Sequence, residues 1–261
     1  MLELYTSEPN TFFLKPLIAL AEKKAHFTAH YFDAANFEQF AANFPAGLEA
    51  SLHLEREGPL LVDGGTIISG TSFMLEYISE SVPGPSLMPA DPYDAYQARA
   101  WAQYLGAHLG SIVPVLGCAK YLLPQLSALE PALVERRIAA IEPVERRAGW
   151  RAMRDGTYST AYLESVAERL AAPIARIERA LLERSWLAGP GFSAADIDAY
   201  AMLCVLPDLA PTAVNARSTP RIADYLARIA ARDSVREALG TAKTAHPERQ
   251  FVPGIEASRW G

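Results

Sequence analysis

The sequence is poor in cysteine, has no excess of basic residues and shows no histidine pattern that would hold a metal. Its 261 residues include two cysteines, Cys118 and Cys204, which lie far apart in apolar helical surroundings. This pattern favours reduced core thiols in a cytoplasmic protein over a disulfide framework. The formal net charge of −6 gives no basic field for nucleic acid or an anionic membrane. The five histidines lack metal-ligand spacing, so we expect no metal site.

The sequence also contains no apolar run that approaches the length of a membrane span, and Met1-Leu2-Glu3 opens a strand rather than a signal peptide. Hydrophobic residues make up 50% of the chain and charged residues 21%, an ordinary composition for a globular protein. The length suffices for one large or two ordinary domains with a sizeable core.

The stretch from Gly58 to Ile78 predicts a β-hairpin followed by a helix. Asp63-Gly64-Gly65 tolerates the positive φ angles of a tight turn, so the apolar runs 60–62 and 66–68 are expected to pair as strands. The hydroxyl-rich segment 69–72 then offers capping side chains, and apolar residues follow at helical spacing.

Upstream of the hairpin, the sequence predicts a strand, a helix and a second strand over residues 2–5, 12–23 and 27–32. Such a crossover pairs the two strands in parallel. With the hairpin added, residues 1–82 form an α/β domain with a four-stranded sheet. Residues 36–50 are expected to be a short irregular helix and loop.

Residues 83–92 contain four prolines and a glycine, which predicts a linker. Residues 93–240 show helical periodicity and are expected to form an all-α domain, followed by a tail over 241–261 that wanders over the surface. The clearest local signal is Ser193-Ala194-Ala195-Asp196, a capping box flanked by the hydrophobic staple Phe192 and Ile197. It predicts the start of a buried helix that runs to Leu206, where Pro207 ends it. A last helix is expected over 221–239.

This layout resembles the cytosolic glutathione S-transferases, with a thioredoxin-like N-terminal domain and an all-α C-terminal domain. The likeness covers nearly the whole chain, and within the superfamily it is similar to the bacterial β-etherases, which use glutathione to cleave β-aryl ethers of lignin-derived aromatics. The motifs that carry the likeness are Leu14-Lys15-Pro16-Leu17, Phe37-Glu38-Gln39, Pro59 before the hairpin, Pro89-Ala90-Asp91-Pro92-Tyr93, Trp150-Arg151-Ala152-Met153-Arg154-Asp155-Gly156, Ser193-Ala194-Ala195-Asp196 and Thr219-Pro220.

The resemblance implies a site that holds the glutathione thiolate at the start of the first helix, where a hydroxyl or amide donor and the helix dipole stabilise it. In the β-etherases, Asn and Ser directly precede the Leu-Lys-Pro segment. Here Phe12 and Phe13 stand in those places and cannot donate. Asn10 and Thr11 are the candidate catalytic donors if the turn is rearranged; otherwise they shape or cap the turn.

The resemblance also implies contacts to the rest of glutathione. Gly70 stands where the family has a carboxylate and Thr71 where it has a hydroxyl, so Thr71 and its helix N-terminus remain to receive an anion. Losing a charged hydrogen bond of this kind costs about 1.5–3 kcal/mol. Pro59 matches the family's cis-proline, with Gly58 before it; a trans proline at a strand start is the alternative. Gly58, Pro59 and Thr71 therefore predict a vestigial glutathione site that binds weakly or not at all.

Trp101, Tyr104, His108 and Trp150 are candidates for lining an aromatic-substrate pocket, with the helical core as the alternative. Because transferases of this fold dimerise, an emptied thiol site predicts an auxiliary β-etherase subunit paired with a competent related subunit, or with itself. One alternative is a self-sufficient glutathione S-transferase that uses Asn10 or Thr11. Another is a non-enzymatic protein that binds aromatic ligands.

Overall fold

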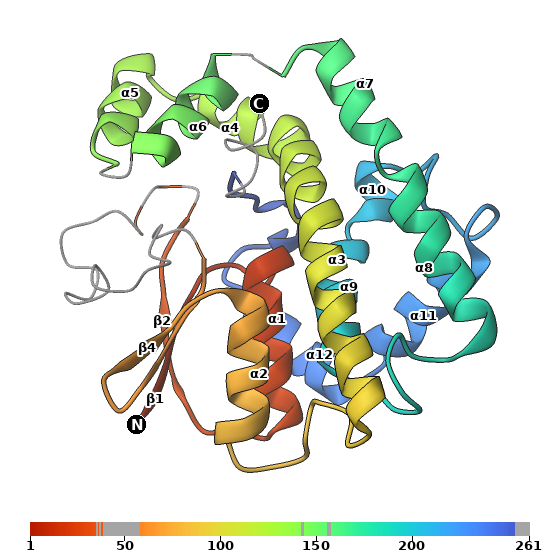
Figure 1. The fold of residues 1–261 in the computed structure, drawn as a ribbon. Helices are drawn as coiled ribbons and strands as arrows, with labels where there is room; N and C mark the ends of the chain where they lie inside the picture. Colours follow the sequence, from red (N-terminus) through yellow and green to blue (C-terminus); the bar gives the residue numbers. More distant parts are fainter. Residues whose placement is uncertain (35, 37, 39–57, 142–143, 156–157, 254–261) are drawn as a thin grey trace.

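The protein was analysed as a computed structural model, which describes residues 1–34, 36, 38, 58–141, 144–155 and 158–253. The described residues of the N-terminal part form four strands and two helices: β1 (Leu2–Thr6), α1 (Thr11–Glu22), β2 (Thr28–Tyr31), β3 (Leu60–Asp63), β4 (Thr66–Ile68) and α2 (Thr71–Ser81). Helices α1 and α2 pack side by side next to the sheet (Figure 1). The irregular segment expected over 36–50 lies largely outside the described residues.

The sheet has the order β2-β1-β3-β4, with β1 parallel to β2 and antiparallel to β3. On β1, Leu4 pairs with Ala29 of β2 and with Leu61 of β3, and both leucines are fully buried. Gly64 and Gly65 have φ values of 56° and 89°, as the tight turn between β3 and β4 requires. The predicted thioredoxin-like arrangement is confirmed.

The rest of the described chain is helical, as predicted. Its elements are α3 (Pro92–Gly117), the π-helical turn η3 (Cys118–Leu122), α4 (Leu123–Ser127), α5 (Pro131–Ala139), α6 (Val144–Arg154), α7 (Thr160–Glu168), α8 (Ala171–Glu183), α9 (Ala194–Leu203), α10 (Leu206–Leu209), α11 (Pro220–Ala230), α12 (Asp233–Leu239) and the 3₁₀ turn η4 (Pro247–Arg249). The domain boundaries at 82, 92 and 240 stay predictions.

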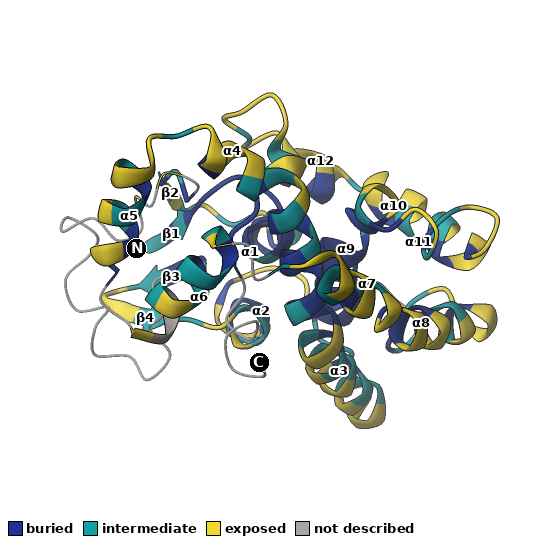
Figure 2. Cartoon of the chain, turned by 90° about the horizontal axis from the view of Figure 1, so that it is seen from above, coloured by how far each residue is buried: buried dark blue, intermediate teal, exposed yellow. Residues whose placement is uncertain are grey.

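Helix α9 forms the centre of the helical part. All ten of its residues are buried, and it contacts α1, α2, α3 and α11. Figure 2 shows it as a dark blue helix between more exposed neighbours. The predicted capping box is present at its start. The Asp196 carboxylate accepts from the Ser193 N–H at 2.9 Å, from the Leu187 N–H at 2.9 Å and from the Tyr225 hydroxyl at 2.8 Å.

Two helices differ from their predicted extents. Helix α9 ends at Leu203 rather than Leu206, because Pro207 has no N–H to donate to Leu203 and the chain restarts as α10. The last predicted helix is split into α11 and α12. Arg232 leaves helical geometry at the break, with ψ of 142°, and its guanidinium binds the Glu22 carboxylate at 2.7 and 2.9 Å.

Residues 241–250 are exposed or half-buried, in line with a tail that runs over the surface, but that expectation is wrong for the apolar pair that follows. Phe251 and Val252 are 3% and 7% exposed, and they pack against the start of α1 and the end of α3. In Figure 1 the dark blue C-terminal segment returns between α3 and the sheet. An apolar pair of this kind gains free energy by burial, which a surface path would forfeit.

One helical stretch, Pro92–Ser127, is long and apolar enough to cross a membrane by length and composition, although no apolar run was expected to approach that length. Half of its most apolar window is buried inside the fold. It packs against α7, α8 and α9, which is the behaviour of a core helix.

Candidate functional site

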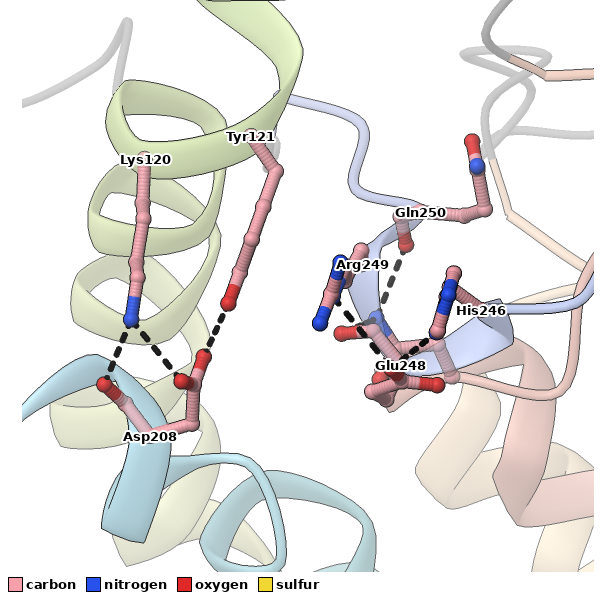
Figure 3. Close-up of polar contacts among 8 residues, drawn as sticks. Lys120, Tyr121, Asp208, His246, Glu248, Arg249 and Gln250 are labelled. Atoms are coloured by element: carbon pink, nitrogen blue, oxygen red, sulfur yellow. Dashed lines mark hydrogen bonds and ion pairs between the residues drawn. The ribbon is translucent and has the colours of Figure 1, made fainter.

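The start of α1 is where the sequence places a possible thiol donor. Asn10 occupies the N-cap position and is 2% exposed, yet its side chain does not cap its own helix. Its Nδ2 group donates instead to the backbone carbonyl oxygens of Gln250 at 2.8 Å and Glu248 at 3.4 Å. Figure 3 shows these two residues beside His246 and Arg249. The Asn10 amide is therefore committed to the C-terminal segment.

Thr11 and the two phenylalanines complete this turn. Thr11 has a φ of 44°, a left-handed conformation that is unfavourable for a β-branched residue and typical of constrained sites. Phe13 is buried in a cluster with Phe32, Ala34 and Val252. Phe12 lies against the core, with the Lys15 ammonium 5.2 Å from its ring centroid. Neither ring can donate a hydrogen bond to a thiolate.

The start of α2 is tied to the two helices beside it. Gly70 caps α2 without a side chain, at a φ of 79°, and the Thr71 hydroxyl accepts from the Lys15 ammonium at 3.4 Å. Lys15 also forms an ion pair of 2.6 Å with Asp198 of α9, and both side chains are almost fully buried. Ser72 donates to the same carboxylate at 3.2 Å. This polar cluster joins the sheet-containing part of the chain to α9.

Gly58 and Pro59 enter β3. The described residues contain no cis peptide bond, so the bond before Pro59 is trans. A glutathione site of the family type would need a free donor at the start of α1, a carboxylate near Gly70 and the cis-proline turn. Among the described residues, the Asn10 amide is engaged elsewhere, residue 70 has no side chain and the bond before Pro59 is trans.

A cavity of about 190 Å³ lies beside the start of α1. Glu8 and Asp33 give its wall two carboxylates, and the described lining includes no basic side chain. Glu8 is 3% exposed and accepts from the Tyr31 hydroxyl at 2.7 Å. Burial, together with the Glu8 carboxylate, raises the pKa of Tyr31 well above its usual value. The rest of the lining is mainly apolar: Phe13, Ala34, Leu122, Leu126, Leu129, Phe251 and Val252.

Three of the four predicted pocket residues are neighbours on α3, and the fourth is buried in the core. Trp101 and Tyr104 line a wide groove of about 750 Å³ between α3 and α8, where the Arg176 guanidinium lies 4.5 Å from the Tyr104 ring centroid. His108 lies against Tyr104, with ring centroids 4.3 Å apart and the rings tilted by 53°, but it is not part of the groove lining. Trp150 is fully buried in the core. Their role in substrate binding stays a prediction.

Sequence reasoning missed three features of this region: the C-terminal contacts, the Glu8–Tyr31 pair and the buried Lys15–Asp198 ion pair. Each joins residues that are far apart in the chain, which a single sequence does not reveal. Two local signals were present. Lys15 is a charged residue inside an apolar helix, and Phe251-Val252 is an apolar pair inside a polar tail.

Comparison with known proteins agrees with this architecture. A family model described as "Glutathione S-transferase, C-terminal domain" matches residues 139–233. Solved structures that are less than 25% identical to this chain share its fold. A glutathione transferase homologue from Sulfitobacter with bound glutathione has a TM-score of 0.63 at 22% identity, covering 92% of this chain and 98% of that chain. Transferase F7 from Populus trichocarpa has a TM-score of 0.67 at 17% identity, covering 92% and 99%. The chain therefore resembles the glutathione S-transferases in sequence over residues 139–233 and in fold over most of its length.

The chain also resembles LigF of Sphingobium sp. strain SYK-6. The two sequences are 27% identical over 242 residues, which cover 90% of this chain and 92% of LigF. The crystal structure of beta-etherase LigF superposes with a TM-score of 0.84 at 26% identity and covers 92% of this chain and 99% of that chain. The similarity thus extends over both the sheet and the helical part.

Proposed function

We propose that this chain is a subunit of a glutathione-dependent β-etherase that cleaves β-aryl ether bonds of lignin-derived aromatics. In this proposal the chain is the auxiliary subunit of a heterodimer, and a related glutathione S-transferase subunit supplies the thiol chemistry. The end-to-end similarity to beta-etherase LigF supports the reaction class.

The proposed auxiliary role is supported by the hydrogen bonds of the Asn10 amide. The amide of Asn10, one of the two candidate thiol donors, donates to backbone carbonyls of the same chain. Phe12 and Phe13 follow where the β-etherases have donors. A thiolate placed here would meet aromatic rings and an engaged amide, so its stabilisation would fall short by the 1.5–3 kcal/mol, roughly, of a charged hydrogen bond.

The groove between α3 and α8 supports a role in assembly. Tyr93 and Tyr96 of this groove are 65% and 62% exposed, and Arg176, Arg179 and Arg184 add positive charge. Exposed aromatic and arginine side chains are enriched at protein interfaces. We assign this groove to the contact with the related subunit; a homodimer through the same surface is the competing arrangement.

The test measures glutathione-dependent cleavage of an aromatic β-ether by three samples: this chain alone, a related transferase with intact donors alone, and the two together. The chain alone should be inactive, and the mixture should form a heterodimer that is active. Asn10→Ala in this chain should leave the activity of the mixture unchanged, whereas loss of the partner's thiol donor should abolish it.

Two alternatives make different predictions. A self-sufficient transferase that uses Asn10 or Thr11 would turn over alone and lose activity in Asn10→Ala. A non-enzymatic binding protein would bind aromatic ligands in the cavity beside Glu8 without any dependence on glutathione or a partner. The proposal places the chain in the cytoplasm, where glutathione is available and the thiols of Cys118 and Cys204 stay reduced.

A further inference from the structure

The C-terminal strap, which we define as residues 243–252, is attached to the start of α1 by polar contacts at both ends. At its beginning, the Lys243 N–H lies 3.2 and 3.3 Å from the two oxygens of Glu8. Toward its end, the carbonyls of Glu248 and Gln250 accept from Asn10. The strap thus presents its backbone to Asn10 as a bound peptide ligand would.

An aromatic anchor holds the strap against the end of α3. The Phe251 ring stacks on Tyr121 of η3, with centroids 6.1 Å apart and an interplanar angle of 8°. The ring fits because residue 117 is glycine: a Cβ at Gly117 would lie 2.2–2.4 Å from three carbons of the Phe251 ring. No side chain can share that space with the ring. Gly117 therefore forms a notch that admits Phe251.

The platform under this anchor is itself held in place. Lys120 and the Tyr121 hydroxyl both bind the Asp208 carboxylate, as Figure 3 shows, and Lys120 also donates to the Asp208 carbonyl at 2.8 Å. The Arg249 guanidinium lies 5.7 Å from the Tyr121 ring centroid. The π-helical turn that carries Tyr121 is a rare feature that is frequent at functional sites.

We propose that the strap is an autoinhibitory contact. Its backbone carbonyls occupy the Asn10 amide, and Gln250, Phe251 and Val252 form one wall of the cavity beside Glu8. The site opens when Phe251 leaves the Gly117 notch, which frees the Asn10 donor and exposes the cavity. The closed form then contributes, together with the missing donors, to the poor fit for glutathione.

Gly117→Ala tests the notch in the full-length chain. Gly117 has helical φ and ψ of −65° and −45°, so alanine suits the backbone and favours the helix, while its methyl group displaces the Phe251 ring. Gly106→Ala is the matched control, because it lies in the same helix with nothing within 4 Å of the added Cβ. Phe251→Ala removes the anchor without any change to α3.

The first measurement is hydrogen–deuterium exchange of the strap, supported by the rate of tryptic cleavage after Arg249. In Gly117→Ala and Phe251→Ala, strap exchange should rise at least about tenfold, while α9 and the sheet keep their protection. Gly106→Ala should match the wild-type chain. Unchanged strap exchange in both variants would show that Phe251 and the notch do not hold the strap.

The second measurement is calorimetric titration with glutathione, and it alone rests on the proposed function. Wild type and Gly106→Ala should give no saturable heat, whereas release of the Asn10 donor should give a saturable isotherm with a Kd at least about tenfold below the detection limit of the wild-type titration. A freed strap with unchanged glutathione affinity would overturn the autoinhibitory role. The etherase assay of the two subunits is a separate experiment. Failure of the heterodimer proposal would appear in that assay, whereas failure of the autoinhibition proposal would appear in the exchange and titration data.

Discussion

Helices α9 and α1 both start at buried residues, but the polar side chains at the two starts differ in where they find their hydrogen-bond partners. At the start of α9, the Asp196 carboxylate accepts from the Ser193 N–H within the capping box. Outside the box it accepts from the Leu187 N–H and the Tyr225 hydroxyl. At the start of α1, Asn10 has a residue type suited to capping but donates to the strap, some 240 residues away. The first arrangement is structural. The second is available for function because a competing ligand can replace the strap.

The starts of α9 and α1 also differ in backbone strain. Ser193 at the N-cap of α9 has an extended conformation and a capping box. The first residue of α1, Thr11, is held at a φ of 44°. Strain of this kind costs roughly 1–3 kcal/mol and persists only where surrounding contacts enforce it. The residue before Thr11, Asn10, is held by the strap.

The largest effect is expected at Asp196. Asp196→Ala leaves the Tyr225 hydroxyl and the N–H groups of Ser193 and Leu187 buried without their acceptor. The free energy of unfolding should fall by about 5 kcal/mol, or the chain should fail to fold. Urea unfolding measures this loss. Asp224→Ala, at an exposed position beside Tyr225, should change stability by less than about 0.5 kcal/mol.

A second large effect should come from the ion pair that connects the two helices. Lys15→Met leaves the Asp198 carboxylate buried without its cation, at a loss of about 3–5 kcal/mol. The double variant Lys15→Met, Asp198→Asn should recover much of that loss, because it also removes the buried charge. Denaturant unfolding of the two variants decides this. Equal losses in both would mean that the pair does not act as a unit.

The other end of α1 should respond to pH. Partial desolvation raises the pKa of the Glu22 carboxylate. The hydrogen bonds from Arg232 and Ser234 and the charge of Arg232 lower the pKa by more than desolvation raises it, so the net shift is downward. Stability from this pair is therefore present above the unfolded-state pKa of about 4.3 and is lost as pH falls through the lower folded-state pKa. Glu22→Gln should lose about 1–3 kcal/mol at neutral pH and show a flatter acid limb in thermal unfolding.

The smallest effect compares the two helix starts directly. Asn10→Ala and Ser193→Ala should each cost about 1 kcal/mol. Hydrogen exchange should separate them: Asn10→Ala loosens the strap and leaves α1 protected, whereas Ser193→Ala loosens the first turn of α9. If Asn10→Ala frayed α1 instead, the claim that Asn10 serves the strap would be wrong.

The same contrast explains what could be predicted from sequence. The βαβ and ββα pattern, the hairpin at Asp63-Gly64 and the capping box at Ser193 depend on neighbours in the chain, and all three were predicted. The trans bond before Pro59 departs from the family turn, and Gly58 gave no signal that would decide the isomer.

The arrangement of the candidate site was less predictable. Its main contacts join residues that are far apart in the sequence: the contacts of the strap, the Glu8–Tyr31 hydrogen bond and the Lys15–Asp198 ion pair. Trp101 and Trp150 were both candidates for lining an aromatic pocket, but residue type and helical spacing do not distinguish a groove from the core. The packing of α6 encloses Trp150 completely.

The central claim is that the start of α1 serves the strap and not a thiol ligand. Isothermal titration of the wild-type chain alone with glutathione tests it most directly. We expect no saturable heat under conditions in which a transferase with intact donors titrates fully. A saturable isotherm with affinity equal to that of the intact transferase would contradict the account.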